Sequence, residues 1–107
     1  MAKQWTELEK LTIPKGERRS NSTSLHPKTG TVATITVYAP RRGDAFVHVS
    51  ADGENFSLFR HRGHAVAVDA NSACDIPLPA CKSMLLQTNA DAEEDLEFRV
   101  LALLEVD

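Results

Sequence analysis

The feature that most constrains this chain is the pair Asp52-Gly53, which stands between two short runs of alternating residues. A two-residue type I′ turn needs positive φ at both central positions, and Asp-Gly is one of the pairs that accept it. Residues 45–51 and 54–60 therefore predict the two strands of a β-hairpin. The hairpin indicates an antiparallel fold and gives no direct information about function.

The predicted turn also fixes which residues lie opposite each other. Side chains alternate across a sheet, so pairing Phe46 with Phe59 places an aromatic pair beside polar residues. This pair is either covered by a second layer or exposed as a surface for a partner. The core-facing set is Ala45, Val47, Val49, Phe56 and Leu58, and the polar face carries His48, Ser50, Asn55 and Ser57.

Other runs predict further strands. Residues 31–39 alternate and are rich in β-branched side chains, which favours a strand. Residues 96–106 alternate over a longer span, although Leu, Ala and Glu leave a helix as the alternative there. Shorter strands are predicted at 6–13, 65–68, 73–78 and 83–88. Roughly seven or eight short strands with tight turns predict an all-β chain, folded as an antiparallel two-sheet β-sandwich that is jelly-roll-like.

Length and composition fit a single domain over residues 1–107. A chain of this size buries about two-thirds of the surface that it exposes when unfolded. The net charge of −3 does not point to a nucleic acid as partner. No apolar run approaches the roughly 18 residues that a membrane span needs, and the first residues lack the apolar segment of a secretory signal. We therefore expect synthesis in the cytoplasm, with no membrane and no nucleic acid as partner.

Cysteines and histidines give little sign of a metal site. Cys74 and Cys81 either close a disulfide loop or remain reduced, and cytosolic synthesis favours the reduced thiols. His61 and His64 form the one close histidine pair, but they straddle a glycine turn beside arginines, whose charge opposes a metal cation. The sequence therefore predicts no metal and no cofactor.

One nucleophile–base pair can be drawn from the predicted hairpin. Ser57 and His48 are cross-strand neighbours on its polar face in that register. The sequence indicates neither an acid that orients such a histidine nor an oxyanion hole. We therefore expect no catalytic residues and a protein that is not an enzyme.

Residues 14–30 form a long polar loop or arm that is locally basic. A connection of this length without periodicity tends to be functional or mobile. It is either a solvated loop or an arm that becomes ordered against an acidic partner surface. Its charged residues are Lys15, Glu17, Arg18, Arg19 and Lys28.

Charge is separated along the chain, with basic residues in predicted loops and acidic residues at 91–97. Separated charge can steer complementary surfaces together, and repeated copies can meet basic loop to acidic loop around a symmetry axis. The triplet at 42–44 also spells the Arg-Gly-Asp motif that integrins bind, although Gly and Asp are ordinary turn residues. The candidate partner-binding residues are Arg18, Arg19, Arg41, Arg42, Phe46, Phe59, Arg60 and Arg62.

Two segments carry a resemblance to a known family. The run from Val47 to Phe56 reads strand, Ser-x-Asp-Gly, aromatic, and the run from Phe98 to Leu103 is an alternating closing strand. Both are similar to segments of the discoidin-type, galactose-binding-like β-sandwiches. The chain lacks the terminal cysteine pair usual in that family, and the family's ligand loops do not map onto it. The resemblance implies a carbohydrate-binding module.

In type, the chain also resembles the small virion proteins of tailed phages, which are compact β-sandwiches with a polar N-terminal segment. Many of these decorate or cement capsids, often as trimers. This resemblance implies a non-enzymatic virion protein, made in the host cytoplasm, that bridges neighbouring subunits of the major capsid or tail protein. It implies a homo-oligomer, with a trimer favoured. The alternative is a carbohydrate-binding module, with a glycan held by loop arginines and an aromatic residue.

Overall fold

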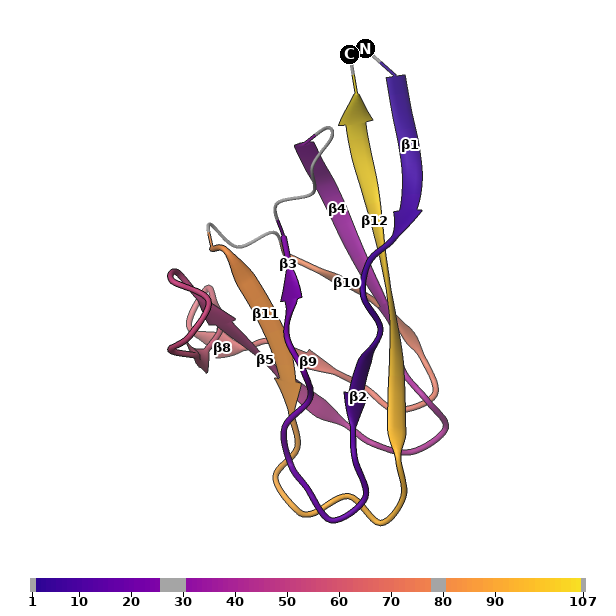
Figure 1. Cartoon of the computed structure of the whole chain (residues 1–107), viewed down its shortest axis with the longest axis vertical. Helices are drawn as coiled ribbons and strands as arrows, with labels where there is room; N and C mark the ends of the chain where they lie inside the picture. Colours follow the sequence, from indigo (N-terminus) through magenta and orange to yellow (C-terminus); the bar gives the residue numbers. More distant parts are fainter. Residues whose placement is uncertain (1, 26–30, 78–80, 107) are drawn as a thin grey trace.

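Two antiparallel sheets packed face to face make up the fold (Figure 1). The computed structural model describes residues 2–25, 31–77 and 81–106, and this part of the chain contains twelve strands and no helix. None of it, therefore, is a helix that could cross a membrane. The predicted all-β two-sheet sandwich is confirmed. Its strands outnumber the seven or eight expected for two reasons. Three predicted strands are each broken into two, and residues 23–24 form a short strand within the loop predicted at 14–30.

The first sheet is built around the longest strand, β12 (Leu96–Val106). Its neighbours are β1 (Ala2–Glu7) on one side and β4 (Thr31–Tyr38) on the other, and β10 (Ala73–Ile76) forms the edge beyond β4. β2 (Leu11–Ile13) continues the line of β1 along β12. The first and the last described strands therefore lie side by side.

The second sheet has β11 (Ser83–Gln87) and β5 (Ala45–Ser50) at its centre. β3 (Thr23–Ser24) borders β11. β6 (Ser57–Leu58) and β9 (Ala67–Val68) share the outer edge of β5. This sheet covers the inner face of the first sheet over part of its length.

A side hairpin, β7 (Arg60–His61) with β8 (His64–Ala65), interrupts the edge formed by β6 and β9. If β1 and β2 count as one strand position, and β6 and β9 as another, eight positions remain in the two sheets. Lettered B to I in chain order, they lie in the orders B-I-D-G and C-H-E-F. These are the orders of a jelly roll, so the predicted topology is confirmed as well.

The core lies between the inner faces of the sheets. On β12 the buried side chains recur at every second residue, which is the period of a strand and rules out the helix considered there. From the facing sheet, Val47, Met84 and Leu86 are fully buried. The inward residues of β12 are Leu96, Phe98, Val100, Ala102 and Leu104.

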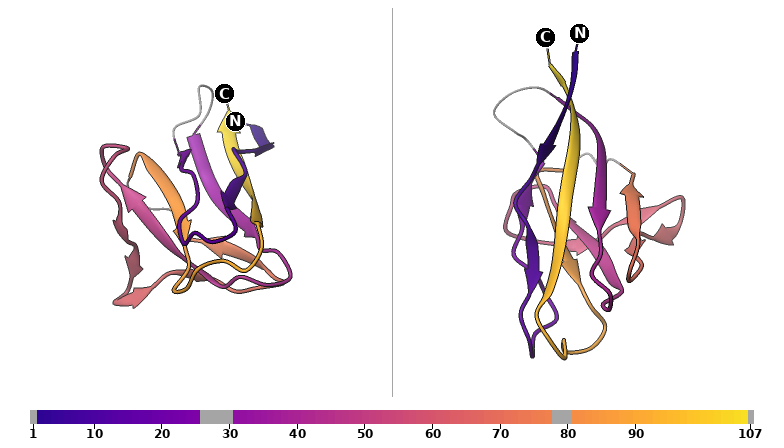
Figure 2. Two further views of the ribbon diagram at one scale, coloured as in Figure 1. Left: turned by 60° about the horizontal axis from the view of Figure 1, so that its bottom comes forward. Right: turned by 90° about the vertical axis from the view of Figure 1, so that its right-hand side faces the viewer.

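The two sheets differ in length. The protein measures 43 × 25 × 24 Å, and β1 and the C-terminal part of β12 extend beyond the second sheet (Figures 1 and 2). Five of the six residues of β1 are exposed as a result.

The turn at Asp52-Gly53 differs from the prediction. Of these two residues only Gly53 has positive φ, at 84°. The Asp52 carboxylate accepts hydrogen bonds from the backbone N–H groups of Asn55 and Glu54, which hold its pKa well below the ordinary value. Asp52 thus closes a longer loop over residues 51–56, because its side chain satisfies the backbone locally.

The longer loop shifts the hairpin register by one residue. His48 now lies opposite Leu58, so Leu58 belongs to the outer face and not to the core face. Phe59 packs against the core, whereas Phe46 alternates with buried neighbours on β5 and faces outward. The predicted register and the Phe46–Phe59 aromatic pair are therefore wrong.

Candidate functional site

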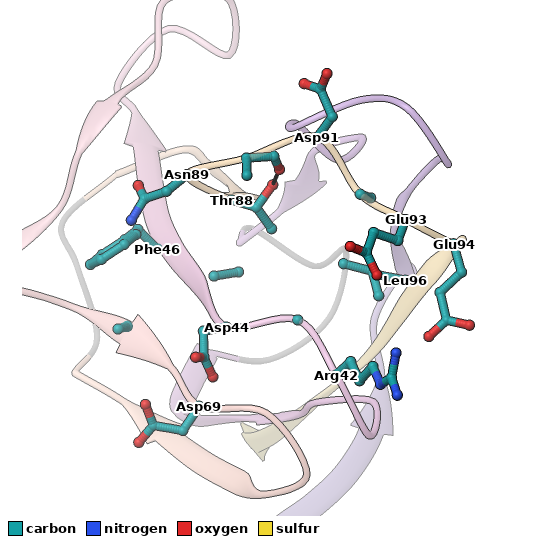
Figure 3. Close-up of a pocket in the computed structure, with 15 residues that line it drawn as sticks. Arg42, Asp44, Phe46, Asp69, Thr88, Asn89, Asp91, Glu93, Glu94 and Leu96 are labelled. Atoms are coloured by element: carbon teal, nitrogen blue, oxygen red, sulfur yellow. Dashed lines mark hydrogen bonds between the residues drawn. The ribbon is translucent and has the colours of Figure 1, made fainter.

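A pocket of about 550 Å³ opens at one end of the sandwich (Figure 3). Three connections form it: the β4–β5 turn, the segment that follows β9, and the β11–β12 loop at 88–95. We call it the end pocket. These connections are far apart in the sequence, and the jelly-roll topology alone brings them together.

The end pocket has an apolar floor and an acidic rim. Ala45, Ala92 and Leu96 are buried beneath it, and half-buried Phe46 lines one side. Among the described lining residues Arg42 is the single cation. The rim carboxylates belong to Asp44, Asp69, Asp91, Glu93 and Glu94.

The rim carboxylates differ in what they do. Asp91 Oδ1 accepts a hydrogen bond from Arg18 Nε at 2.8 Å, and Asp44 Oδ1 accepts one from the backbone N–H of Ala70 at 2.7 Å. These two therefore hold the loops. Glu93 makes no ion pair within the described chain, and in Figure 3 its side chain reaches into the pocket while Asp91 points away. Glu93 is thus placed to meet a ligand.

The first part of the basic segment 14–30 packs on the acidic loop of the same chain. Gly16 N–H donates to the Ala92 carbonyl, and Ala92 N–H donates to the Glu17 carbonyl, both at 2.8 Å. Basic and acidic segments that are separate in the sequence thus meet within one molecule. The end of the predicted arm, residues 26–30, lies outside the described residues.

The predicted partner-binding residues do not gather in one place. Arg42 and Phe46 line the end pocket, and exposed Arg41 precedes it in the same turn. Arg60 and Arg62 are exposed in the side hairpin. Of the predicted set, the structure therefore brings one arginine and one phenylalanine to a common site.

A second, smaller hollow of about 280 Å³ lies on the outer face of the second sheet. His48 stands in it between Phe46 and Leu58. Arg19 crosses this face, because its Nε and Nη2 both donate to Gln87 Oε1, at 3.0 and 2.9 Å. The hollow thus combines apolar side chains with one histidine.

His48 is held in an unfavourable place for a charge. Its buried Nδ1 has no hydrogen-bond partner among the described residues. Burial lowers the pKa of His48, and the positive charge of Arg19 lowers it further. Ser57 lies opposite Val49, on the other face of the sheet, so the nucleophile–base pair drawn from the sequence is not formed.

Cys74 and Cys81 are free thiols in different surroundings. Cys74 Sγ lies 3.3 Å from Ser72 Oγ, and Cys81 Sγ donates to the Ser83 carbonyl at 3.5 Å. Burial raises the pKa of Cys81. Within the described ranges, no three His, Cys, Asp or Glu side chains are grouped so as to hold a metal ion.

The two most exposed aromatic residues, Trp5 and Tyr38, lie outside the predicted set of partner-binding residues. Trp5 is 60% exposed and Tyr38 is 43% exposed, both on the outer face of the first sheet. Trp5 lies opposite Leu103, and the Arg99 guanidinium sits 6.0 Å from the Tyr38 ring centroid. The available signal was an aromatic residue in the polar run at 2–7.

Comparison with protein-family models, curated proteins and solved structures finds no match to this chain.

Proposed function

We propose that this protein is a non-enzymatic interaction module that receives a basic segment of a protein partner in the end pocket. The observation that carries the proposal is the combination of an apolar floor with an acidic rim in one concave site. Concave sites with a largely apolar lining and a few convergent polar groups are the usual form of binding sites.

A lysine or arginine side chain matches both parts of the end pocket. Its aliphatic stem can lie on Phe46 and Leu96 while its charged head reaches Glu93. Hydrogen bonds between such a head and a carboxylate are roughly twice as strong as neutral ones. The rim also attracts a basic segment from a distance, which favours fast association.

The setting that we propose is a bacteriophage virion, on which many copies decorate or cement the capsid or tail. Each rigid sandwich bridges neighbouring subunits of the major capsid or tail protein. Jelly rolls occur in both viral capsid and lectin domains, and this analogy of fold supports the setting. The partner itself is identified by its chemistry alone, as a protein with an exposed basic segment.

A glycan is the second candidate ligand, and one observation favours it. Phe46 lines the end pocket together with Asn89 and the rim carboxylates. An aromatic ring can cover the apolar face of a sugar while amide and carboxylate oxygens accept hydrogen bonds from its hydroxyl groups. This arrangement makes a carbohydrate-binding module of galactose-binding-like type the alternative.

Peptide binding followed by fluorescence anisotropy tests the proposed site. An arginine-rich peptide is expected to bind and a glutamate-rich peptide is not, with weaker binding at high salt. The double variant Asp69→Asn/Glu93→Gln should weaken binding of the arginine-rich peptide by about tenfold, because two rim charges are lost. Glu54→Gln, in the 51–56 loop away from the pocket, is the matched control and should change nothing.

Equal peptide binding by the double variant and by the control contradicts the proposed site. Saturable binding to a glycan array that Phe46→Ala abolishes supports the alternative instead. Mass spectrometry of purified virions tests the setting separately: we expect the chain in many copies per particle, and its absence from particles contradicts a virion role.

A further inference from the structure

β1 has one paired edge and one open edge. It pairs with β12 only, and it lies in the part of the first sheet that extends beyond the second sheet (Figure 1). An open strand edge presents unpaired N–H and C=O groups, which are a template for pairing with another strand. Residues 2–7 contain no proline and no bulge that blocks such pairing.

The hydrogen-bond pattern shows which residues present these groups. Leu8 N–H donates to the carbonyl of Val100 at 2.8 Å, and the register of β1 on β12 places these two residues opposite each other. Alternate residues of an antiparallel strand bond toward the partner and away from it. Because Leu8 bonds toward β12, the odd-numbered residues Lys3, Trp5 and Glu7 direct their N–H and C=O groups to the open edge.

The neighbouring strand β2 shows what a protected edge looks like in this protein. Asn21 accepts a hydrogen bond from Thr12 N–H at 2.8 Å and donates one to the Lys10 carbonyl at 3.0 Å. The Asn21 side chain thus takes the place of a neighbouring strand beside β2. In the described part of the chain nothing does the same for β1.

We propose that two copies of this chain associate through their β1 edges, antiparallel and about a two-fold axis at Trp5. In this register each outward residue meets an outward residue: Trp5 meets Trp5, and Lys3 meets Glu7 of the second copy. A shift by one residue sets outward groups against inward groups, which cannot bond. A shift by two residues separates Lys3 from Glu7 of the second copy. The edge is therefore complementary to itself in one register.

The side chains support the same arrangement. Trp5 is 60% exposed on the outer face of the first sheet. Tryptophan is enriched among the few residues that contribute most of the binding energy at protein interfaces. In a hydrogen-bonded pair the two Trp5 Cα atoms are about 5.5 Å apart, so the indole rings can cover each other. Lys3 and Glu7 are on the same outer face, so both Lys3–Glu7 contacts form beside the indole pair.

The two-fold axis is perpendicular to the first sheet, so the inner faces of the two first sheets lie on the same side. The path β1-β12-β4-β10 of each copy then joins that of the other in a continuous eight-stranded sheet. Each end pocket stays open, because β1 is not among its lining residues. The proposal therefore goes beyond the end-pocket function and does not rest on it. It replaces the trimer favoured from the sequence with a two-fold dimer.

Sedimentation velocity combined with Trp fluorescence tests the dimer in the unmodified chain. Trp5 is the one tryptophan, so its emission reports this contact directly. The proposed interface consists of a single strand edge from each copy, so the dimer is expected to dissociate in the micromolar range. Dilution through that range should convert dimer to monomer and shift the emission to the red. A chain that stays monomeric up to about 100 µM overturns the proposal, as does a dimer whose Trp5 emission does not change on dilution.

A charge exchange between the two copies tests the register. Lys3→Glu and Glu7→Lys each place like charges opposite each other twice in their own dimers, and each should weaken self-association by about tenfold. An equimolar mixture of the two variants restores both attractive contacts, so heterodimers should form with nearly the unmodified affinity. Circular dichroism confirms that each variant is folded.

The mixture also controls for the ion pair between Glu7 and Arg99, which Glu7→Lys removes. The Glu7→Lys chain lacks this ion pair in the homodimer and in the heterodimer. Recovered association in the mixture is therefore due to the contacts between the two copies. A mixture that associates no better than the single variants overturns the antiparallel register. Unchanged dimers of the single variants overturn the β1 interface altogether. Peptide binding at the end pocket should be the same in all of these variants, so a failure here is distinguishable from a failure of the proposed function.

Discussion

Among the described glycines, Gly43 leaves the least room for an added side chain. Its φ is 110°, and a Cβ atom placed there would lie 2.7 Å from Leu96 Cδ1, in the floor of the end pocket. Gly43→Ala is therefore expected to destabilise the protein by about 1–3 kcal/mol, through backbone strain and the contact with buried Leu96. Urea unfolding followed by circular dichroism measures the change.

Gly16 provides the matched control for this substitution. Its φ is also positive, at 85°, but a Cβ atom there would have no neighbour within 4 Å. Gly16→Ala should therefore show the backbone cost alone and be the milder variant. An equal loss of unfolding free energy in the two variants would show that Leu96 moves aside at no cost and that the floor of the end pocket deforms easily.

His48 makes stability depend on pH. Its pKa is lowered in the folded state, so the unfolded chain binds a proton more readily. Its neutral form therefore stabilises the fold fully above the ordinary histidine pKa of about 6.5. This stabilisation is lost as pH falls through that value toward the lower folded pKa.

We expect His48→Leu to flatten the fall in unfolding free energy between neutral and mildly acidic pH. Leucine also suits the hollow, because it leaves no buried nitrogen without a partner. Denaturant titrations across this pH range measure the effect, with His61→Leu in the exposed side hairpin as control. The same slope in His48→Leu and in the unmodified chain contradicts the assigned role of burial.

At the scale of the elements, the Asn21 side chain forms hydrogen bonds with the backbone along the edge of β2 that faces away from β12. Asn21→Ala removes both hydrogen bonds to the β2 edge and should lower the unfolding free energy by about 0.5–1.5 kcal/mol. The Thr12 amide should then exchange with solvent faster. Asn21→Asp keeps an oxygen for Thr12 N–H, so it should keep the protection of that amide. Hydrogen exchange read by NMR decides between these outcomes, and unaltered Thr12 exchange in Asn21→Ala contradicts the edge role.

The hairpin shows how far an element can be predicted from its residues. Alternation of apolar residues correctly predicts β5 and β12, because a two-residue period survives any change in the turns. It does not predict the register beyond Asp52, since Asp-Gly suits both a type I′ turn and a loop closed by the aspartate side chain. In the structure the Asp52 side chain closes the loop, and the resulting one-residue shift in register separates Phe46 from Phe59.

At the scale of the whole molecule, the jelly roll follows from the number and spacing of the strands, but the end pocket does not. Its floor and rim come from connections that no periodicity relates, such as the turn at Gly43 and the loop at Glu93. Likewise the exposure of Trp5 depends on how far the first sheet extends past the second, which is a property of both sheets together. Such features need the packed structure.

The central place of β12 also sets the order in which the protein can be assembled during synthesis. β12 lies between β1 and β4, and Ala2 is opposite Val106, so the first sheet joins residues from opposite ends of the described chain. Every strand of the second sheet is translated before β12. The first sheet therefore lacks its central strand until the last part of the described chain has been made, and non-local pairing of this kind folds slowly. A nascent chain that stalls before residue 96 holds β1, β2 and β4 without the strand that joins them.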